Sequence, residues 1–326
     1  MVSNQKHIVV VGSCMIDFVS YAPRLPGPGE TIHGTKFATN FGGKGANQCI
    51  AAAKLGGRNY ACRQGTNPFE TPYKSFSCII FQVGDDIWGK KYIESLKNDG
   101  IRVDYVEETE GVSTGIAQII VSDAGENQIV IVAGANLRLS VQDVGTAKDV
   151  IADAAIVVLQ LETPVEVAIE TLRLCKGISI LNGAPAIAQF DPELLTLPSI
   201  FCVNEPEATV FTGLPVNNKS EAETAAIKLL SMGCKSVIIT LGAAGALYVS
   251  NEDKQFVHVC SPSVKCVDST GAGDAFIGAL AYLLANRKDL GIERALLYAC
   301  MIAADSVTRP GTQISFPGPE ILKQVV

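Results

Sequence analysis

A glycine-rich segment near the end of the chain, VDSTGAGDAF, contains two acids, Asp268 and Asp274. The apolar run after it predicts a helix, so the free amides of Gly271, Ala272 and Gly273 are expected to converge at its positive N-terminus. Such a loop is an anion hole, suited to a phosphate or to charge that develops during phosphoryl transfer. Asp274 itself is interpreted either as a catalytic group or as an ordinary helix cap.

A second glycine-rich segment, FGGKGANQ, opens a predicted helix at residues 44–55. Its three glycines allow the backbone to approach something small, and Lys44 and Asn47 could donate hydrogen bonds to hydroxyl groups. The alternative is a glycine turn before a helix, with a solvated Lys44. Taken alone, this segment leaves both interpretations open.

Two more segments follow predicted strands. In VNEPE, Asn204 and Glu207 stand at the carboxyl end of a strand, where open sheets bind ligands. Glu207 could hold a magnesium-bound water, because magnesium keeps several waters and few protein ligands. Helix capping would explain the same pair of residues. In ITLGAAG, Gly242 and Gly245 would let the backbone come close to a nucleotide.

Strand-like and helix-like runs alternate between these segments. Short β-branched runs that are apolar on both faces predict buried parallel strands at 7–12, 78–84, 154–160, 178–184, 200–205 and 236–242. Helices are predicted at 44–55, 87–98, 164–175, 206–211, 220–232, 274–286 and 291–306. The alternation predicts an α/β fold with three layers, α/β/α, around a mostly parallel sheet. We expect a single domain over residues 1–326.

Three stretches break this alternation. Residues 17–40 and 101–133 contain alternating, partly polar strands with glycine turns, which predict a small antiparallel sheet that acts as a lid. The polar segment 58–77 is far longer than the usual connection between a helix and a strand. It is interpreted as a functional loop, an isoform-specific segment or a gene-model artefact.

Composition excludes several classes of protein. The net charge of −7 argues against nucleic acid or anionic lipid as a partner, and no apolar stretch reaches membrane-spanning length. The ten cysteines are scattered singly and the three histidines lie far apart, which favours reduced thiols over disulfides and argues against a zinc site. We expect a cytoplasmic protein, and a nuclear fraction stays open. The first strand–helix turn, VVGSCMID, lacks the glycine triplet of a Rossmann dehydrogenase.

Together, and in this order, the four segments resemble the ribokinase family of carbohydrate kinases. GGKGAN is similar to the N-terminal signature of that family and DSTGAGDAF to its C-terminal one, and the resemblance runs from about residue 7 to 318. It implies an enzyme that phosphorylates D-ribose at the 5-hydroxyl with ATP, giving ribose 5-phosphate and ADP. The alternatives are a fructokinase-like or adenosine-kinase-like member of the family, and a non-catalytic sugar- or nucleotide-binding protein.

The resemblance implies a role for each matching residue. Asp274 would be the base, and the amides of Gly271, Ala272 and Gly273 the anion hole. The sugar would be held by Asp17, Gly43, Lys44, Asn47, Glu162 and Asp274. ATP would lie along Asn204, Thr240, Leu241, Gly242, Ala243, Ala244, Gly245, Gly273 and Asp274. A monovalent cation, usually K⁺, would be held by Asp268, Thr270, Ser306, Arg309, Gly311 and Ser315, and Mg²⁺ by Glu207 through a water.

The chain departs from the family pattern at Met15, where many members carry asparagine two residues before the first sugar-binding aspartate. This leaves the preference between ribose and 2-deoxyribose open. In the family the lids of two subunits usually pack together, which implies a homodimer. The identity of the monovalent ion is not determined by the sequence.

Overall fold

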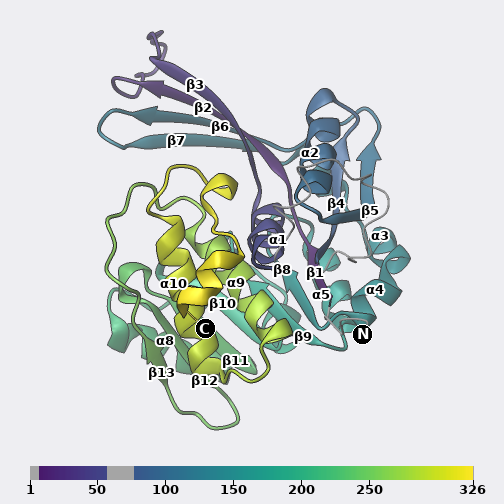
Figure 1. Ribbon diagram of the computed structural model, residues 1–326, viewed down its shortest axis with the longest axis vertical. Coiled ribbons are helices and arrows are strands. Elements are labelled where there is room, and N and C mark those ends of the chain that lie inside the picture. The colour runs from purple at the N-terminus through teal and green to yellow at the C-terminus, as the bar shows by residue number, and fades with distance from the viewer. Residues whose placement is uncertain (1–6, 57–76, 326) are drawn as a thin grey trace.

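The structure is a computed structural model that describes residues 7–56 and 77–325. A nine-stranded sheet in the order β13-β12-β11-β10-β9-β8-β1-β4-β5 forms its centre (Figure 1). Its strands are β1 (Ile8–Val11), β4 (Ser77–Gly84), β5 (Arg102–Thr109), β8 (Ile156–Leu159), β9 (Ile178–Asn182), β10 (Ile200–Asn204), β11 (Ser236–Thr240), β12 (Ala246–Ser250) and β13 (Val257–Val259). All pairs from β11 to β5 are parallel, and β12 and β13 are antiparallel at one edge.

Helices cover both faces of this sheet. They are α1 (Lys44–Leu55), α2 (Ile87–Asn98), α3 (Val141–Thr146), α4 (Lys148–Asp153), α5 (Val165–Leu174), α6 (Glu193–Thr196), α7 (Glu205–Thr212), α8 (Lys219–Ser231), α9 (Ala272–Asn286), α10 (Ile292–Ser306) and α11 (Leu322–Val325). Short 3₁₀ turns lie at η2 (Gly134–Arg138), η3 (Gly242–Ala244), η4 (Gln313–Ser315) and η5 (Pro319–Ile321). The predicted strands and helices all occur, most within two residues of the expected bounds, and the predicted three-layer arrangement is confirmed.

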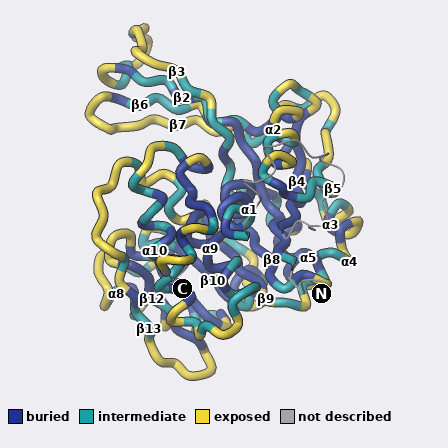
Figure 2. Tube along the Cα trace, viewed as in Figure 1, coloured by how far each residue is buried: buried dark blue, intermediate teal, exposed yellow. Residues whose placement is uncertain are grey.

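The strand β1 shows why the sequence contains continuous apolar runs. Ile8 and Val10 belong to the core on the side of α1, α2, α9 and α10, whereas Val9 and Val11 belong to the core on the side of α4, α5 and α8. Successive side chains of a strand point to opposite faces, so a strand covered on both faces must be apolar at every position. The central strands are accordingly buried throughout in Figure 2.

A second, four-stranded sheet projects from the larger part, in the order β3-β2-β6-β7 (Figure 1). Its strands are β2 (Met15–Ala22), β3 (Lys36–Gly42), β6 (Ile116–Ser122) and β7 (Asn127–Val132). The outer pairs are antiparallel, as expected, but β2 and β6 are parallel, so the expectation of a wholly antiparallel lid is wrong at its centre. The physical reason is connectivity: β6 reaches β2 from the main sheet rather than through a hairpin.

The prediction that all of 101–133 belongs to the lid is wrong for its first strand. Residues Arg102–Thr109 form β5, which pairs in parallel with β4 at the edge of the main sheet. An edge strand has one face less covered than a central strand, so it shows the same polar alternation as a lid strand. The segment 58–77 lies outside the described residues except for Ser77, which begins β4.

The two helices that follow the glycine-rich segments pack directly on each other. A side chain at Gly278 of α9 would place its Cβ 2.5 Å from Ala51 Cβ and 2.6 Å from the Gln48 carbonyl oxygen of α1, so only glycine fits at this crossing. Asp274 lies one helical turn before Gly278, and Asn47 lies one turn before Ala51. The close crossing therefore brings the first turns of α1 and α9 together. No helix in the described ranges is both long and apolar enough to cross a bilayer.

Candidate active site

The carboxylate of Asp274 is held by α1. Asp274 is the third residue of α9, whose N-cap is Gly271 with a positive φ of 79°, so Asp274 does not cap the helix. Asp274 is 8% exposed. Asn47 Nδ2 donates to Oδ2 and Gln48 Nε2 donates to Oδ1, each at 2.9 Å. Both oxygens of a buried carboxylate thus receive a neutral amide donor from the FGGKGANQ segment.

Burial raises the pKa of Asp274, and the positive charge of Lys44 and the donors from Gln48 and Asn47 lower it in part. The net effect is a raised pKa. A carboxylate with a raised pKa is a better proton acceptor, and the hydrogen bonds from Asn47 and Gln48 favour its anionic form. This environment suits a general base.

Lys44 stands where several acids meet. Its backbone N–H donates to Glu162 Oε2 at 2.9 Å, and the Ser13 hydroxyl donates to the same oxygen. Burial lowers the pKa of the Lys44 ammonium, but the carboxylates of Asp274, Glu162 and Glu207 outweigh this and raise it. These carboxylates favour the charged form of Lys44, as a binding role requires.

The carboxylate of Asp17, on β2, interacts electrostatically with those of Glu162 and Asp274. Burial and the charges of Glu162 and Asp274 raise its pKa to about 7. A side chain on Gly42 would place Cβ 2.4 Å from Asp17 Oδ2, so the glycine makes room for the carboxylate. Gly43 adopts a φ of 89°, and a Cβ there would lie 2.6 Å from Cys14 Cα, so both glycines are required sterically.

The residues expected to bind ATP lie at the carboxyl ends of β10 and β11. Asn204 and Thr240 are register partners on these parallel strands. The turn η3 that follows Thr240 is exposed, and added Cβ atoms at Gly242 and at Gly273 would meet nothing within 4 Å. At Gly242 the φ of 53° favours glycine, whereas nothing in the described chain excludes a side chain at Gly273. The open space beside both glycines fits the close approach of a ligand.

The structure decides two expectations, one for Asn204 and Glu207 and one for the amides of the anion hole. Asn204 and Glu207 form a capping box, in which Asn204 Oδ1 accepts from the Glu207 amide at 2.8 Å and Glu207 Oε2 accepts from the Asn204 amide at 2.9 Å. The capping interpretation is thus confirmed. The expectation of three free amides in the anion hole is wrong for Ala272, whose N–H donates to the Ser269 carbonyl at 3.2 Å.

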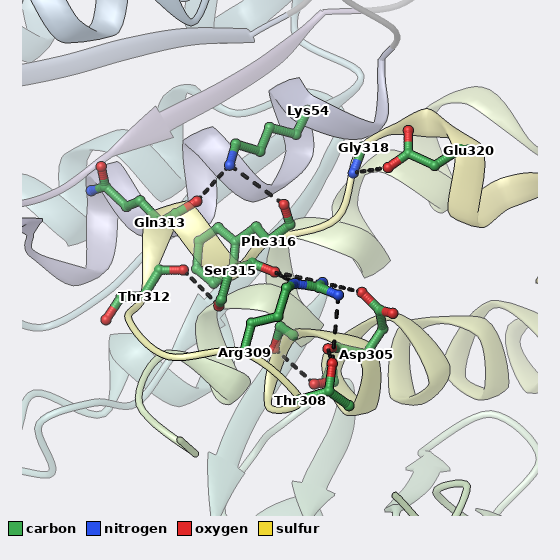
Figure 3. Close-up of polar contacts among 12 residues, drawn as sticks. Lys54, Asp305, Thr308, Arg309, Thr312, Gln313, Ser315, Phe316, Gly318 and Glu320 are labelled. Carbon is green, nitrogen blue, oxygen red and sulfur yellow. Dashed lines mark hydrogen bonds and ion pairs between the residues drawn. The ribbon is translucent and has the colours of Figure 1, made fainter. Parts of the chain in front are cut away.

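Some residues expected at the monovalent cation lie in one cluster. The Asp268 carboxylate accepts from the amides of Thr270 and Gly311, both at 2.9 Å. Although burial raises the pKa of Asp268, these bonds lower it overall. Arg309 donates through Nε and Nη2 to the Ser315 carbonyl at 3.2 and 2.8 Å (Figure 3). Among the described residues, no three or more His, Cys, Asp or Glu side chains are grouped to hold a metal ion.

Sequence reasoning missed the amide side chains behind Asp274. They are Gln48, Gln160, Asn182 and Gln313, all buried. Gln48 donates to Asn182 Oδ1 at 3.1 Å and accepts from Gln160 Nε2 at 2.6 Å. Their signal in the sequence is a polar residue at the end of an apolar strand, as in AAIVVLQ and ISILN, which also occurs without function.

The sequence matches the pfkB family of carbohydrate kinases over residues 5–319. It is 45% identical over 313 residues to a ribokinase from Mus musculus, covering 95% of this chain and 91% of that one. It is 37% identical over 316 residues to a deoxyribokinase from Salmonella typhi, covering 96% of each.

A solved structure of Arabidopsis thaliana ribokinase complexed with ribose and ATP superposes with a TM-score of 0.85 at 29% identity, covering 98% of this chain and 99% of that one. The family match spans almost the whole chain, and the strongly similar relatives are covered over nearly their full length. The chain belongs to the pfkB family of carbohydrate kinases.

Proposed function

We propose that the protein transfers the γ-phosphoryl group of ATP to the 5-hydroxyl of D-ribose, giving ribose 5-phosphate and ADP. The observation that carries the proposal is the buried Asp274 carboxylate, held by Asn47 and Gln48 at the N-terminus of α9 beside Lys44. The ribokinase names of similar chains, and the neighbour solved with ribose and ATP, support the choice of substrates.

In the proposed reaction Asp274 accepts the proton of the 5-hydroxyl. The freed oxygen forms a bond to the γ-phosphorus, while the bond from that phosphorus to the bridging oxygen of ADP breaks. The amides of Gly271 and Gly273 and the positive end of α9 would stabilise the charge on the transferring group. Asp17, Gly43, Asn47 and Glu162 would hold the sugar hydroxyls, because carboxylates accept and amides donate hydrogen bonds to them.

ATP would occupy the open ends of β10 and β11, along Asn204, the 240–245 turn and Gly273. Magnesium would neutralise phosphate charge, and Glu207 fits a water-mediated contact to it. One oxygen of Glu207 belongs to the capping box, and burial raises its pKa. A single carboxylate of this kind agrees with the few protein ligands that magnesium takes.

We also propose a monovalent cation at the 268–315 cluster, with potassium as the first ion to test. The bonds of Asp268 to Thr270 and Gly311 already gather three of the expected positions. The segment that contains Ser306 and Arg309 is joined to this cluster by the Asp268 amide, which donates to the Val307 carbonyl at 3.2 Å. At Ser315 the carbonyl oxygen accepts from Arg309, so a contact to the ion would come from the hydroxyl oxygen, whose proton is donated to the Thr312 carbonyl.

A homodimer through the lid agrees with the apolar surface of β7. Ile129, Val130, Ile131 and Val132 are each at least 48% exposed, as the exposed β7 trace in Figure 2 indicates. An edge strand with this surface favours pairing with a second copy. Sedimentation at micromolar protein would detect the dimer, and a monomer at all concentrations would contradict it. Nine free cysteines among the described residues agree with a reducing compartment such as the cytoplasm.

The central experiment measures ADP release with ATP, magnesium and D-ribose, with and without potassium. Fructose, adenosine and 2-deoxy-D-ribose serve as alternative acceptors. Ribose-dependent turnover that potassium stimulates is expected. Turnover with one of the other acceptors but not with ribose would show that the acceptor is a different sugar or nucleoside. A folded protein that binds ribose without turnover would indicate a non-catalytic binding protein.

A further inference from the structure

A continuous hydrogen-bond chain leads from the base of the lid to Asp274. The Tyr92 hydroxyl of α2 donates to the Gly42 carbonyl at 2.5 Å, and Gln313 Nε2 donates to the Tyr92 oxygen at 3.0 Å. The same Gln313 amide donates to Asn47 Oδ1 at 2.8 Å. Asn47 then donates through Nδ2 to Asp274 Oδ2 at 2.9 Å. All five groups are buried.

The direction of this chain is forced by its far end. A backbone carbonyl can only accept, so the hydroxyl of Tyr92 must point at Gly42 and its oxygen is left to accept. Gln313 therefore presents its two N–H groups to Tyr92 and to Asn47. Because Asn47 accepts through Oδ1, its NH₂ group must face Asp274. Reversing the amide of Asn47 would place an oxygen against the carboxylate, which is repulsive.

The second oxygen of Asp274 is supported in the same way. Asn182 Nδ2 donates to the Cys202 carbonyl at 3.2 Å, so Asn182 Oδ1 is left to accept from Gln48. Gln160 donates to Gln48 Oε1, which turns the NH₂ group of Gln48 toward Asp274. Two independent chains, each ending on a backbone carbonyl, thus aim one donor at each oxygen.

Gln313 differs from the other members because it comes from the C-terminal loop, and a lysine of α1 holds that loop. Lys54 Nζ donates to the Gln313 carbonyl at 2.5 Å and lies 3.4 Å from the Phe316 carbonyl (Figure 3). In the figure Lys54 reaches from α1 to both carbonyls, and Arg309 binds Ser315 from the other side of the loop. The loop that presents Gln313 is therefore fixed at the carbonyls of Gln313, Ser315 and Phe316.

We propose that Gln313 and Tyr92 are positioning residues for Asp274, and that Lys54 fixes Gln313 in the loop. They orient the Asn47 amide so that it donates to the base, and they touch neither sugar nor nucleotide in this scheme. The inference rests on the proposed function, in which Asp274 is the base. It adds that the arrangement of the 313–316 loop acts on the base through a single glutamine side chain.

The decisive variants are Gln313→Leu and Tyr92→Phe, with Gln82→Leu as the matched control. Gln82 is likewise buried and its amide is bonded at both ends, to Asp143 and Thr109, away from Asp274. We expect kcat to fall roughly 10-fold in Gln313→Leu and about 3-fold in Tyr92→Phe, since a hydrogen bond to a charged group is lost or weakened. The KM for ATP should stay unchanged, and Gln82→Leu should retain kcat.

A second measurement does not depend on turnover. The Asp274 carboxyl is titrated by NMR in protein labelled at aspartate side-chain carbons, with Asp274→Asn as the assignment. The charged groups acting at this carboxyl are Lys44 of α1, Asp17 of β2 and Glu207 of α7. They are the same in every variant, so a higher pKa in Gln313→Leu and Tyr92→Phe, but not in Gln82→Leu, reports the lost donor.

The two measurements separate the possible outcomes. A folded Gln313→Leu protein with unchanged kcat and an unchanged Asp274 titration overturns the positioning role, as does an equal loss in Gln82→Leu. If the parent protein phosphorylates no sugar, the proposed function fails, and the titration still decides whether Gln313 and Tyr92 act on Asp274. Lys54→Met should also lower kcat, although every residue of the hydrogen-bond chain to Asp274 is still present. Lys54→Arg keeps a donor at this position and should retain kcat.

Discussion

Two acids occupy the same position in two helices and have different partners. Glu207 is the third residue of α7, which follows β10 directly, and Asp274 is the third residue of α9, which follows a glycine turn. Glu207 turns back to its own N-cap, Asn204, and closes a capping box. Asp274 is instead held by two amides from α1. One acid stabilises its own helix, and the other is held in place by a different helix.

The N-cap residue explains the difference. Asn204 offers both a side-chain oxygen and an amide, so a glutamate three residues later can complete the reciprocal bonds. Gly271 has no side chain to accept from the Asp274 amide, so the reciprocal pair of a capping box cannot form at α9. Close packing of α1 on α9 at Gly278 then supplies its partners. A missing cap at a helix N-terminus leaves both the acid and the amides available for other contacts.

The most severe way to break the comparison is Asp274→Asn. If Asp274 is the base, kcat should fall roughly 10²- to 10⁴-fold, because general-base catalysis contributes about that factor. Ribose affinity, measured by calorimetry, should change little. Glu221→Gln is the control, since Glu221 is the third residue of α8 and makes only local bonds to Asn217 and Asn218. Near-normal turnover of Asp274→Asn would remove Asp274 from the mechanism.

A third acid, Asp17, extends the comparison, and its test is the free energy of unfolding of Asp17→Asn at several pH values. Burial and nearby carboxylates raise the pKa of Asp17 from an ordinary 3.8 to about 7. Between these values the folded protein binds the extra proton, so the free energy of unfolding falls as pH rises through this window. Removing the acid should therefore stabilise the protein above pH 7, by at most about 4 kcal/mol.

Denaturant unfolding at several pH values tests this prediction. The gain from Asp17→Asn should shrink as pH falls from neutral and vanish only below the ordinary pKa of 3.8, where the wild-type carboxyl is protonated in both the folded and the unfolded state. Glu221→Gln should show no such growth with pH, since hydrogen bonds to its carboxylate lower the pKa of Glu221 instead. A pH-independent difference would mean that burial does not shift Asp17.

The smallest expected effect comes from Glu207→Ala. Loss of the capping box should reduce the free energy of unfolding by about 1 kcal/mol, the usual value for a helix cap. Asp274→Asn should cost less, because it removes a buried charge and no helix cap. Equal destabilisation by the two variants, measured in urea, would show that the two acids have the same structural role after all.

Local patterns were sufficient for the central strands and the long helices. The helices Lys44–Leu55 and Ile87–Asn98 begin and end where the sequence predicts. Glycine turns and caps mark helix ends within a few residues, so short-range chemistry determines them. The β-branched runs predicted the central strands for the same reason. The short antiparallel edge strands β12 and β13 were not predicted, since an edge strand has a weak periodic signal.

The sequence did not predict which distant strands and side chains contact each other. The lid assignment of Arg102–Thr109 failed because period-two polarity describes an edge strand and a lid strand equally well. Only the packing of distant segments decided which sheet this strand joins. The partner of Glu207 was foreseeable from residues three apart, whereas those of Asp274 come from more than 200 positions away.

The sequence by itself determined which chemical groups this protein has at its site: a carboxylate, a lysine, carboxamides and glycine turns, each at the start of a helix or the end of a strand. The tertiary structure alone decided how those groups are oriented. The oxygen and the NH₂ group of an amide side chain can exchange places by a rotation, and the neighbouring sequence does not favour either orientation. Distant partners that can only accept, such as the Gly42 and Cys202 carbonyls, select one orientation. Helix and strand signals are short-range, but hydrogen-bond direction at Asp274 depends on contacts across the whole fold.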